Sequence, residues 1–145
     1  MKSFKKHLNN RKGMTLIEIL IVITLIALTG TFAATKFMRM QDEGKQNASK
    51  GLMSEIGVAL NDYRRHCNSY PTTEQGLKAL IEKPSTPPSC DKYDPEGYIN
   101  AKNLKDGWGH EFVYESDGNK YQLKSLGSDG REGGDAYAKD FTNDE

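Results

Sequence analysis

The chain has 145 residues, a formal net charge of zero and 36% hydrophobic residues. Charge is spread unevenly, because residues 1–13 carry five basic residues and no acidic one, which leaves fifteen basic against twenty acidic residues in the remainder. That remainder has no basic stripe, so we expect no nucleic-acid partner. Without the N-terminal apolar run, roughly 110 residues are left, enough for one small domain but not for two.

An apolar run follows the basic segment at once, from Met14 to Thr35, and Glu18 is its single charge. About 20 apolar residues are enough for a helix to span a bilayer. A carboxylate inside such a helix costs roughly 2.5–3.5 kcal/mol on insertion scales, so Glu18 is expected to have a partner. By the positive-inside rule, the basic end stays in the cytoplasm and the acidic remainder lies outside.

Two ordinary membrane signals fit this segment less well. A secretory signal peptide needs an apolar core of only about 7–15 residues, although residues 31–33 could serve as its cleavage site. A plain membrane anchor explains neither Glu18 nor the abrupt junction between Gly13 and Met14.

The sequence GMTLIE at residues 13–18, followed by a long apolar run, resembles the processing site of type IV pilins and pseudopilins. The resemblance implies that a prepilin peptidase cuts between Gly13 and Met14, removes the leader of residues 1–13 and methylates the amine of Met14. It also implies that Glu18 pairs with the N-terminal ammonium of a neighbouring subunit. The family usually has phenylalanine where this chain has Met14. Residues 14–36 would be the transmembrane and assembly helix, and residues 37–145 a periplasmic domain.

Helical periodicity continues past the apolar run. Apolar residues recur at spacings of four and three and form one stripe, made of Ala48, Leu52, Ile56, Leu60 and Tyr63. The pattern predicts a single helix over about residues 14–66, some 80 Å long at 1.5 Å per residue. The alternative is a break near Gly44, in a polar stretch.

The rest of the chain predicts a short helix and a small antiparallel sheet. Thr72 and Gln75 have capping-box spacing before a short helix predicted over residues 73–82. A proline-rich connection over residues 84–97 follows. After it, Tyr98 and Ile99 could start a brief extended segment. The sequence DGWG at residues 106–109 is a turn. Strands are predicted over residues 110–114 and 120–125, joined by a turn at residues 116–119.

The two cysteines, Cys67 and Cys90, both follow the apolar run. An even pair on the oxidising side of a bacterial membrane predicts a disulfide. The alternative is two unpaired thiols.

The chain from Leu126 onward alternates glycines with carboxylates and has too few apolar residues for a helix or strand. Asp129, Asp135 and Asp140, with Glu132 in reserve, have the oxygen ligands that calcium prefers. The spacing does not match an EF-hand. On composition alone, both a calcium loop and a solvated acidic tail remain open.

Four further segments resemble the major pseudopilins of bacterial type II secretion (protein G of the general secretion pathway). They are YPTTEQGLKAL at residues 70–80, GYI at 97–99, DGWGHEFVY at 106–114 and YQLKSLGSDGREGG at 121–134. The resemblance implies an α+β, type IV pilin-like fold whose last loop binds Ca²⁺. The loop pattern matches at the Leu126 carbonyl, Asp129 and Asp140, and less closely at Asp135.

The same resemblance implies a structural subunit that polymerises through its N-terminal helix into a pseudopilus and drives export of folded proteins across the outer membrane. Its partners would be further copies of itself, minor pseudopilins, the prepilin peptidase and the inner-membrane assembly platform. The alternatives are a type IV pilus subunit for adhesion or motility, and a minor pseudopilin. We expect no enzyme, because His7, His66 and His110 have no metal-ligand spacing and no G-x-S-x-G motif is present.

Overall fold

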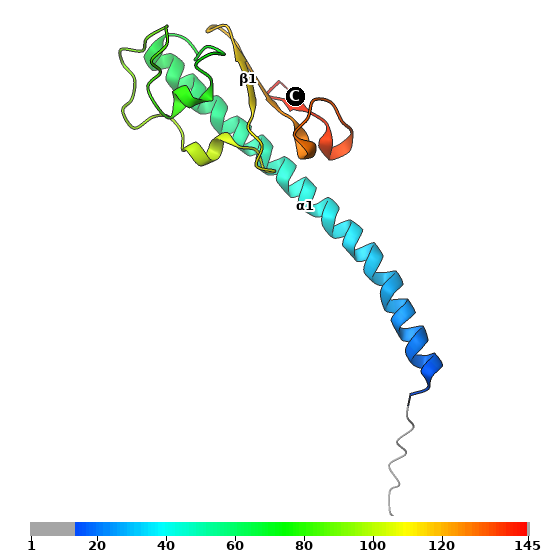
Figure 1. Ribbon diagram of the computed structural model, residues 1–145. Helices are drawn as coiled ribbons and strands as arrows, with labels where there is room; N and C mark the ends of the chain where they lie inside the picture. The colour runs from blue at the N-terminus through cyan, green and yellow to red at the C-terminus, as the bar shows by residue number, and fades with distance from the viewer. Residues whose placement is uncertain (1–13, 145) are drawn as a thin grey trace, which may run out of the picture. The chain divides into compact units, whose positions relative to one another are not determined.

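The computed structural model describes residues 14–144, so residues 1–13, which include the predicted leader and Gly13, lie outside the described part of the chain. Its helices and strands, shown in Figure 1, are α1 (Leu16–Cys67), η1 (Leu77–Leu80), η2 (Ala101–Leu104), β1 (Val113–Ser116), β2 (Tyr121–Ser125), η3 (Gly127–Asp129), η4 (Ala136–Ala138) and β3 (Phe141–Thr142). The chain divides into two compact units, Met1–Met38 and Arg39–Glu145. The predicted α+β class is confirmed.

The predicted long helix is confirmed as α1, which runs from Leu16 to Cys67 without a break at Gly44. The hydroxyl of Thr15 accepts the N–H of Glu18 at 3.3 Å and so satisfies one of the free donors of the first turn. Asn68 ends the helix in the left-handed region, with φ 64°, and its N–H donates to the carbonyl of Arg64 at 2.8 Å.

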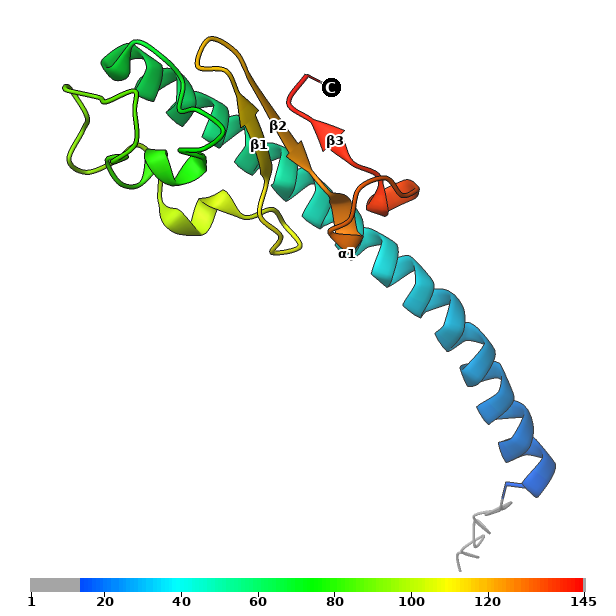
Figure 2. The ribbon, with the colours of Figure 1, turned by 45° about the horizontal axis from the view of Figure 1, so that its top comes forward.

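Three antiparallel strands in the order β1-β2-β3 form the sheet of the second unit. Figure 2 shows them side by side along the second part of α1. Tyr114 pairs with Leu123, and Ser125 pairs with Phe141. The side chains of these strands alternate between the core and solvent, as expected for a sheet with one covered face.

The core lies between α1 and this sheet. Its fully buried apolar side chains on α1 are Ile56, Leu60 and Tyr63, and Leu80 and Leu123 meet them from η1 and β2. Covering each aliphatic side chain of this size contributes about 1.5–3 kcal/mol relative to leaving it exposed.

The buried stripe of α1 starts one residue later than the sequence pattern predicted. Ala48 is exposed, and Ser49 is fully buried in its place. Ser49 tolerates burial because its hydroxyl donates to the Lys45 carbonyl at 2.8 Å and accepts the N–H of Gly107 at 2.8 Å. Ala48, which the apolar pattern placed in the stripe, does not belong to the buried face, because the pattern counted only apolar residues.

The short helix predicted over residues 73–82 is reduced to the single 3₁₀ turn η1. The capping box forms as expected, since the Gln75 side chain accepts the N–H of Thr72 at 3.0 Å and the Thr72 hydroxyl accepts the N–H of Gln75 at 3.3 Å. Gly76 then adopts φ 61° and ψ −171°, which no α-helix contains. The backbone at Gly76 therefore prevents an α-helix from continuing through this segment, and only the 3₁₀ turn after it forms.

The first predicted strand starts three residues too early. Residues 105 and 111 form an isolated bridge, and Asp106 and His110 close a tight turn in which the N–H of Asp106 donates to the His110 carbonyl at 2.8 Å. The backbone groups at His110 are therefore used in the turn, and β1 begins only at Val113. The hairpin turn correspondingly moves to residues 117–120.

The third strand, β3, was not predicted. It has only two residues, and the side chain of Asn143 fixes its end by accepting the N–H of Leu123 at 2.7 Å. Tyr98 and Ile99 form no strand, because the N–H of Tyr98 donates instead to the Leu80 carbonyl at 2.7 Å.

A disulfide joins Cys67 and Cys90, the pairing expected from the sequence. It fastens the proline-rich connection to the end of α1, and the side-chain amide of Gln75 adds hydrogen bonds to the carbonyls of Thr86 at 2.7 Å and Pro88 at 3.0 Å. Within the connection, the ring of Tyr93 contacts the rings of Tyr63 and Tyr98, with ring centroids 6.2 Å and 5.4 Å apart. This burial raises the pKa of Tyr93 to about 12.

We predict that replacing both cysteines, Cys67→Ser with Cys90→Ser, lowers the free energy of unfolding by about 3 kcal/mol, because the cross-link spans 23 residues and restricts the unfolded chain. Urea denaturation followed by circular dichroism measures the change. Dithiothreitol should destabilise the wild-type chain to a similar extent and leave the double variant unaffected. Equal denaturation midpoints for the two proteins would contradict the prediction.

Gly107 lies directly against the backbone of α1, and a Cβ at this position would overlap the carbonyl of Lys45. We predict that Gly107→Ala destabilises the fold by about 1–3 kcal/mol through overpacking. Gly51→Ala is the matched control, because Gly51 lies in α1 with no atom near its missing Cβ, and alanine should stabilise an exposed helix by up to about 1 kcal/mol. Thermal unfolding measures the stability of both variants. A Gly107→Ala variant as stable as the wild type would refute the close approach of Gly107 to the backbone of α1.

Candidate functional site

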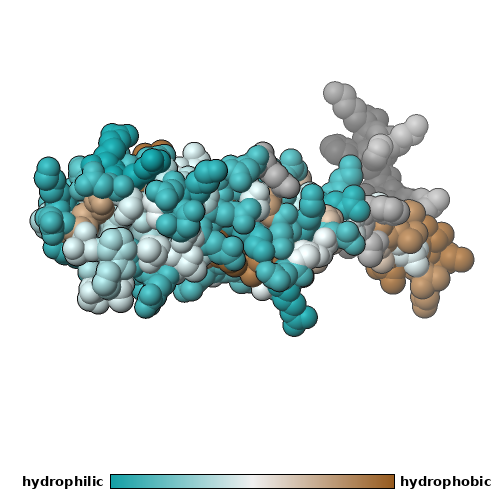
Figure 3. All heavy atoms as spheres, turned by 90° about the horizontal axis from the view of Figure 1, so that it is seen from above, coloured by the Kyte–Doolittle hydropathy of each residue, from teal (hydrophilic) through white to brown (hydrophobic). Residues whose placement is uncertain are grey.

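The first part of α1 is apolar on every face, and its large side chains are exposed. Leu16 is 86% exposed and Phe37 is 62% exposed, and the same holds for Ile19, Ile23, Leu25 and Ile26 between them. Figure 3 shows this surface as a brown group of atoms, whereas the visible face of the second unit is mostly hydrophilic. Helix α1 is long and apolar enough here to cross a membrane.

Two hydroxyl groups inside this apolar stretch are satisfied by the helix itself. Thr24 donates to the Ile21 carbonyl at 2.8 Å, and Thr29 donates to the Leu25 carbonyl at 3.0 Å. No polar partner outside the helix is needed for these two side chains, which makes the segment compatible with a hydrocarbon environment.

Glu18 lies in the first turn of α1 and is exposed. A carboxylate in the first turn is favoured by the partial positive charge of the helix N-terminus. Within residues 14–144 no ion pair reaches Glu18. Its carboxylate is therefore available for a charge that another molecule supplies.

The C-terminal loop, residues 126–140, consists of two 3₁₀ turns that pack against each other, η3 and η4. Ala136, the first residue of η4, has φ 53°, a left-handed conformation that costs a residue with a Cβ of order 1–2 kcal/mol. The surrounding loop holds it there: the N–H of Ala138 donates to the Asp135 carbonyl at 3.0 Å. The loop is therefore folded, in contrast to a solvated tail.

The predicted metal ligands take different positions in this loop. Asp129 accepts the N–H of Arg131 at 3.1 Å, and Asp140 accepts the N–H of Gly133 at 3.1 Å. Glu132 is occupied by an ion pair with Lys124 at 3.1 Å, and that hydrogen bond raises the pKa of Lys124. Asp135 is exposed and makes no side-chain cap to η4.

The donor chemistry of the loop fits a calcium ion only if backbone carbonyls contribute. In the part of the chain that the structure describes, no three Asp, Glu, His or Cys side chains gather closely enough to hold a metal by themselves. The second carboxylate oxygen of Asp140, Oδ1, is buried and has no hydrogen-bond partner. Calcium accepts mixed carboxylate and carbonyl ligands, so this unpaired oxygen is chemically suited to be one of its ligands.

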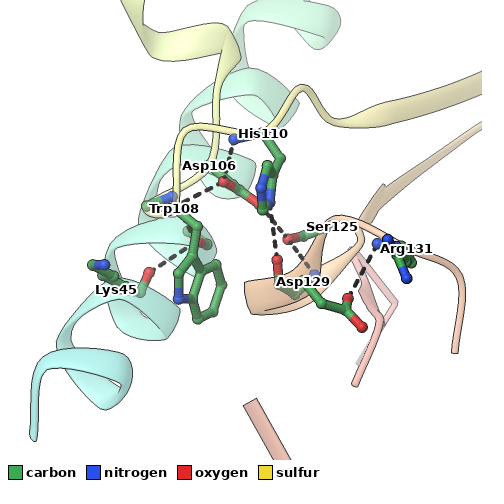
Figure 4. A network of polar contacts seen from close by, with 10 residues as sticks. Lys45, Asp106, Trp108, His110, Ser125, Asp129 and Arg131 are labelled. Carbon is green, nitrogen blue, oxygen red and sulfur yellow. Dashed lines mark hydrogen bonds and ion pairs between the residues drawn. The ribbon is translucent and has the colours of Figure 1, made fainter. Parts of the chain in front are cut away.

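Sequence reasoning missed a polar cluster next to this loop, shown in Figure 4. Its centre is the buried carboxylate of Asp106, which accepts hydrogen bonds from the N–H of His110 at 2.8 Å and the hydroxyl of Ser125 at 2.9 Å. The turn at residues 106–109 was predicted, but nothing in its pattern indicates that the strand residue Ser125 faces the same carboxylate.

Comparison with known proteins places the chain. Residues 8–34 match the prokaryotic N-terminal methylation motif, and residues 36–144 match the family described as type II secretion system protein G. Type II secretion system core protein G of Pseudomonas aeruginosa is 35% identical over 135 residues, which cover 92% of this chain and 94% of that protein. The corresponding protein of Vibrio cholerae is 33% identical over 141 residues, covering 95% of this chain and 94% of that protein.

A solved structure is also similar. The major pseudopilin from the type 2 secretion system of enterohaemorrhagic Escherichia coli superposes with a TM-score of 0.63 and 30% identity, covering 73% of this chain and 87% of that one. The motif and the fold define a pilin-like protein with an N-terminal methylation motif. More narrowly, the chain belongs to the type II secretion system protein G family.

Proposed function

We propose that this protein is the structural subunit of a type II secretion pseudopilus, which polymerises through its N-terminal helix and drives folded proteins across the outer membrane. The observation that carries the proposal is the apolar surface of α1 between Leu16 and Phe37, whose large side chains are exposed wherever the structure describes them, next to a methylation motif. Such a surface is stable only in lipid or against other apolar helices. Copies of the same helix supply that second environment.

Glu18 supplies the selectivity of this assembly. The prepilin peptidase would remove residues 1–13 by cutting between Gly13 and Met14, and the new ammonium group at Met14 would face Glu18 of the neighbouring subunit. In a low-dielectric environment an ion pair compensates desolvation only with good geometry, and removal of one member leaves the other charge unpaired. The pair therefore acts as a register device for subunit addition.

The proposal also includes a location and a set of partners for the subunit. Residues 14–36 would anchor the subunit in the bacterial inner membrane with a single pass, and residues 37–145 would lie in the periplasm. Before and during assembly the subunit would contact the assembly platform in that membrane, the minor pseudopilins and further copies of itself. The names of the relatives, core protein G and major pseudopilin, support this role over a type IV pilus subunit or a minor pseudopilin.

We further propose that the C-terminal loop binds Ca²⁺. The unpaired Oδ1 of Asp140, the carboxylate of Asp129 and the carbonyl of Leu126 would hold the ion, and Asp135 would complete the set. Bound calcium would neutralise the carboxylates and tie η3 to η4. Because the ion binds the folded loop and not the unfolded chain, it stabilises the protein by mass action.

We predict that Glu18→Ala leaves membrane insertion intact and abolishes assembly, because the apolar run loses its single charge while the partner of the Met14 amine is lost. Membrane fractionation measures insertion, and chemical cross-linking in cells that carry the secretion machinery measures polymer ladders. Glu43→Ala, which removes an exposed glutamate from the same helix, is the control and should assemble normally. Normal ladders in Glu18→Ala would contradict the pairing.

We predict that calcium raises the melting temperature of the wild-type chain and that EDTA reverses the increase. At a free concentration of one hundred times the dissociation constant, the stabilisation should be about 2.7 kcal/mol. Asp140→Asn keeps an acceptor for the N–H of Gly133 but should lose the calcium response. Glu132→Gln removes only the exposed ion pair with Lys124 and should retain it. A wild-type melting temperature that is insensitive to both additions would refute the calcium site.

A further inference from the structure

Asp106 is a buried acidic residue that neither polymerisation nor direct calcium binding uses. The residue is 5% exposed, and it is the single charged residue among the buried polar groups of the described chain. Burying a carboxylate is costly unless hydrogen bonds surround it, so the contacts of Asp106 indicate what it holds in place.

One carboxylate oxygen of Asp106 organises its own turn. Oδ1 accepts the N–H of Trp108 at 3.0 Å and the N–H of His110 at 2.8 Å. The turn is also fastened to α1, because the N–H of Gly107 donates to the hydroxyl of Ser49 at 2.8 Å, and that hydroxyl donates to the Lys45 carbonyl. Asp106 is therefore fixed relative to the second part of α1.

The other oxygen of Asp106 reaches toward the C-terminal loop. Oδ2 accepts the hydroxyl of Ser125 at 2.9 Å, and the oxygen of that hydroxyl accepts the N–H of Gly127 at 3.4 Å. The Gly127 carbonyl lies 3.1 Å from Nδ1 of His110. Because a carbonyl only accepts, Nδ1 is the donor in this pair. Figure 4 shows His110 and Ser125 converging on Asp106, with Asp129 beside them.

Both polar backbone groups of Gly127 are thus held by side chains that Asp106 positions. Gly127 lies between Leu126 and Asp129, whose carbonyl and carboxylate are two of the proposed calcium donors. We infer that Asp106 is a positioning residue for the loop segment 126–129, which it fixes against α1 through Ser125 and His110. The inference deepens the calcium proposal and rests on it for the function of the loop.

A carboxylate is needed at this position for a definite reason. Three groups donate hydrogen bonds to it, two backbone N–H groups to Oδ1 and a hydroxyl to Oδ2, and Nδ1 of His110 lies 3.9 Å from Oδ2. Asparagine offers one acceptor oxygen and an amide nitrogen that only donates. In Asp106→Asn, one of the donors must therefore lose its acceptor. If the side-chain oxygen of asparagine stays with the two N–H groups of the turn, its nitrogen takes the place of Oδ2, and the hydroxyl of Ser125 loses its acceptor.

The test compares the full-length chain in detergent with Asp106→Asn, Ser125→Ala and the control Asp117→Asn. Asp117 likewise accepts two backbone N–H groups, from Asn119 and Lys120, at 2.8 Å each, and these hydrogen bonds lower its pKa, but it lies exposed in the hairpin turn. Calcium titration by calorimetry and hydrogen exchange of the amides of residues 126–130 are both measured. Ser125→Ala keeps the turn intact and so covers the case in which Asp106→Asn fails to fold.

We expect both test variants to raise the calcium dissociation constant by about tenfold or more, as loss of a residue supporting metal ligands typically does. We also expect faster hydrogen exchange at residues 126–130. Asp117→Asn should match the wild type in both. Unchanged calcium affinity and unchanged exchange in the two test variants would overturn the inference. A merely structural role predicts faster exchange throughout the second unit instead of at the loop, and this result would overturn it as well.

The two proposals can fail separately. If the wild-type chain itself does not bind calcium, the calcium proposal is wrong. Amide hydrogen exchange in the metal-free protein then tests whether Asp106 positions the loop. Faster exchange confined to residues 126–130 in Asp106→Asn and Ser125→Ala would then still support positioning of the loop, and exchange equal to that of Asp117→Asn would refute it.

Discussion

The apolar surface of α1 between Leu16 and Phe37 is the constraint on which the biology of this protein depends. Covering one such side chain is worth about 1.5–3 kcal/mol, and the large apolar side chains that the structure describes in this segment are exposed. Lipid and neighbouring helices are almost equally apolar, however, so the transfer from membrane to filament gains little from the hydrophobic effect. Packing and the few polar groups must decide between the two, which gives the single carboxylate of Glu18 its importance.

The second unit solves a different problem, because a small core must hold a loop-rich chain together. Apolar contacts along α1 provide the base, and buried polar groups fix the connections to it: Ser49 holds the turn at Gly107, Gln75 holds the proline-rich connection, and Asp106 holds Ser125. Each of these polar groups is satisfied by hydrogen bonds, as burial requires. The disulfide adds a covalent link between the end of α1 and the proline-rich connection.

The sequence predicted the features that depend on local periodicity or pairing. The long helix, the hairpin, the capping box of Thr72 and Gln75, and the cysteine pair were all readable from spacing. Three of the misses share a cause, because each depends on contacts between distant segments. Ser49 is buried only because Gly107 meets it, β3 exists only because it pairs with β2, and the role of Asp106 depends on Ser125, which lies nineteen residues away.

The most direct test of the account is the mass of the N-terminal peptide of the native protein, because both charge pairing and assembly require a free amine at the start of the apolar run. We predict a chain that begins at Met14 with an N-methyl group on its amine. A chain that retains residues 1–13 and still polymerises, or one that begins at Ala34 after signal-peptide cleavage, would contradict the account.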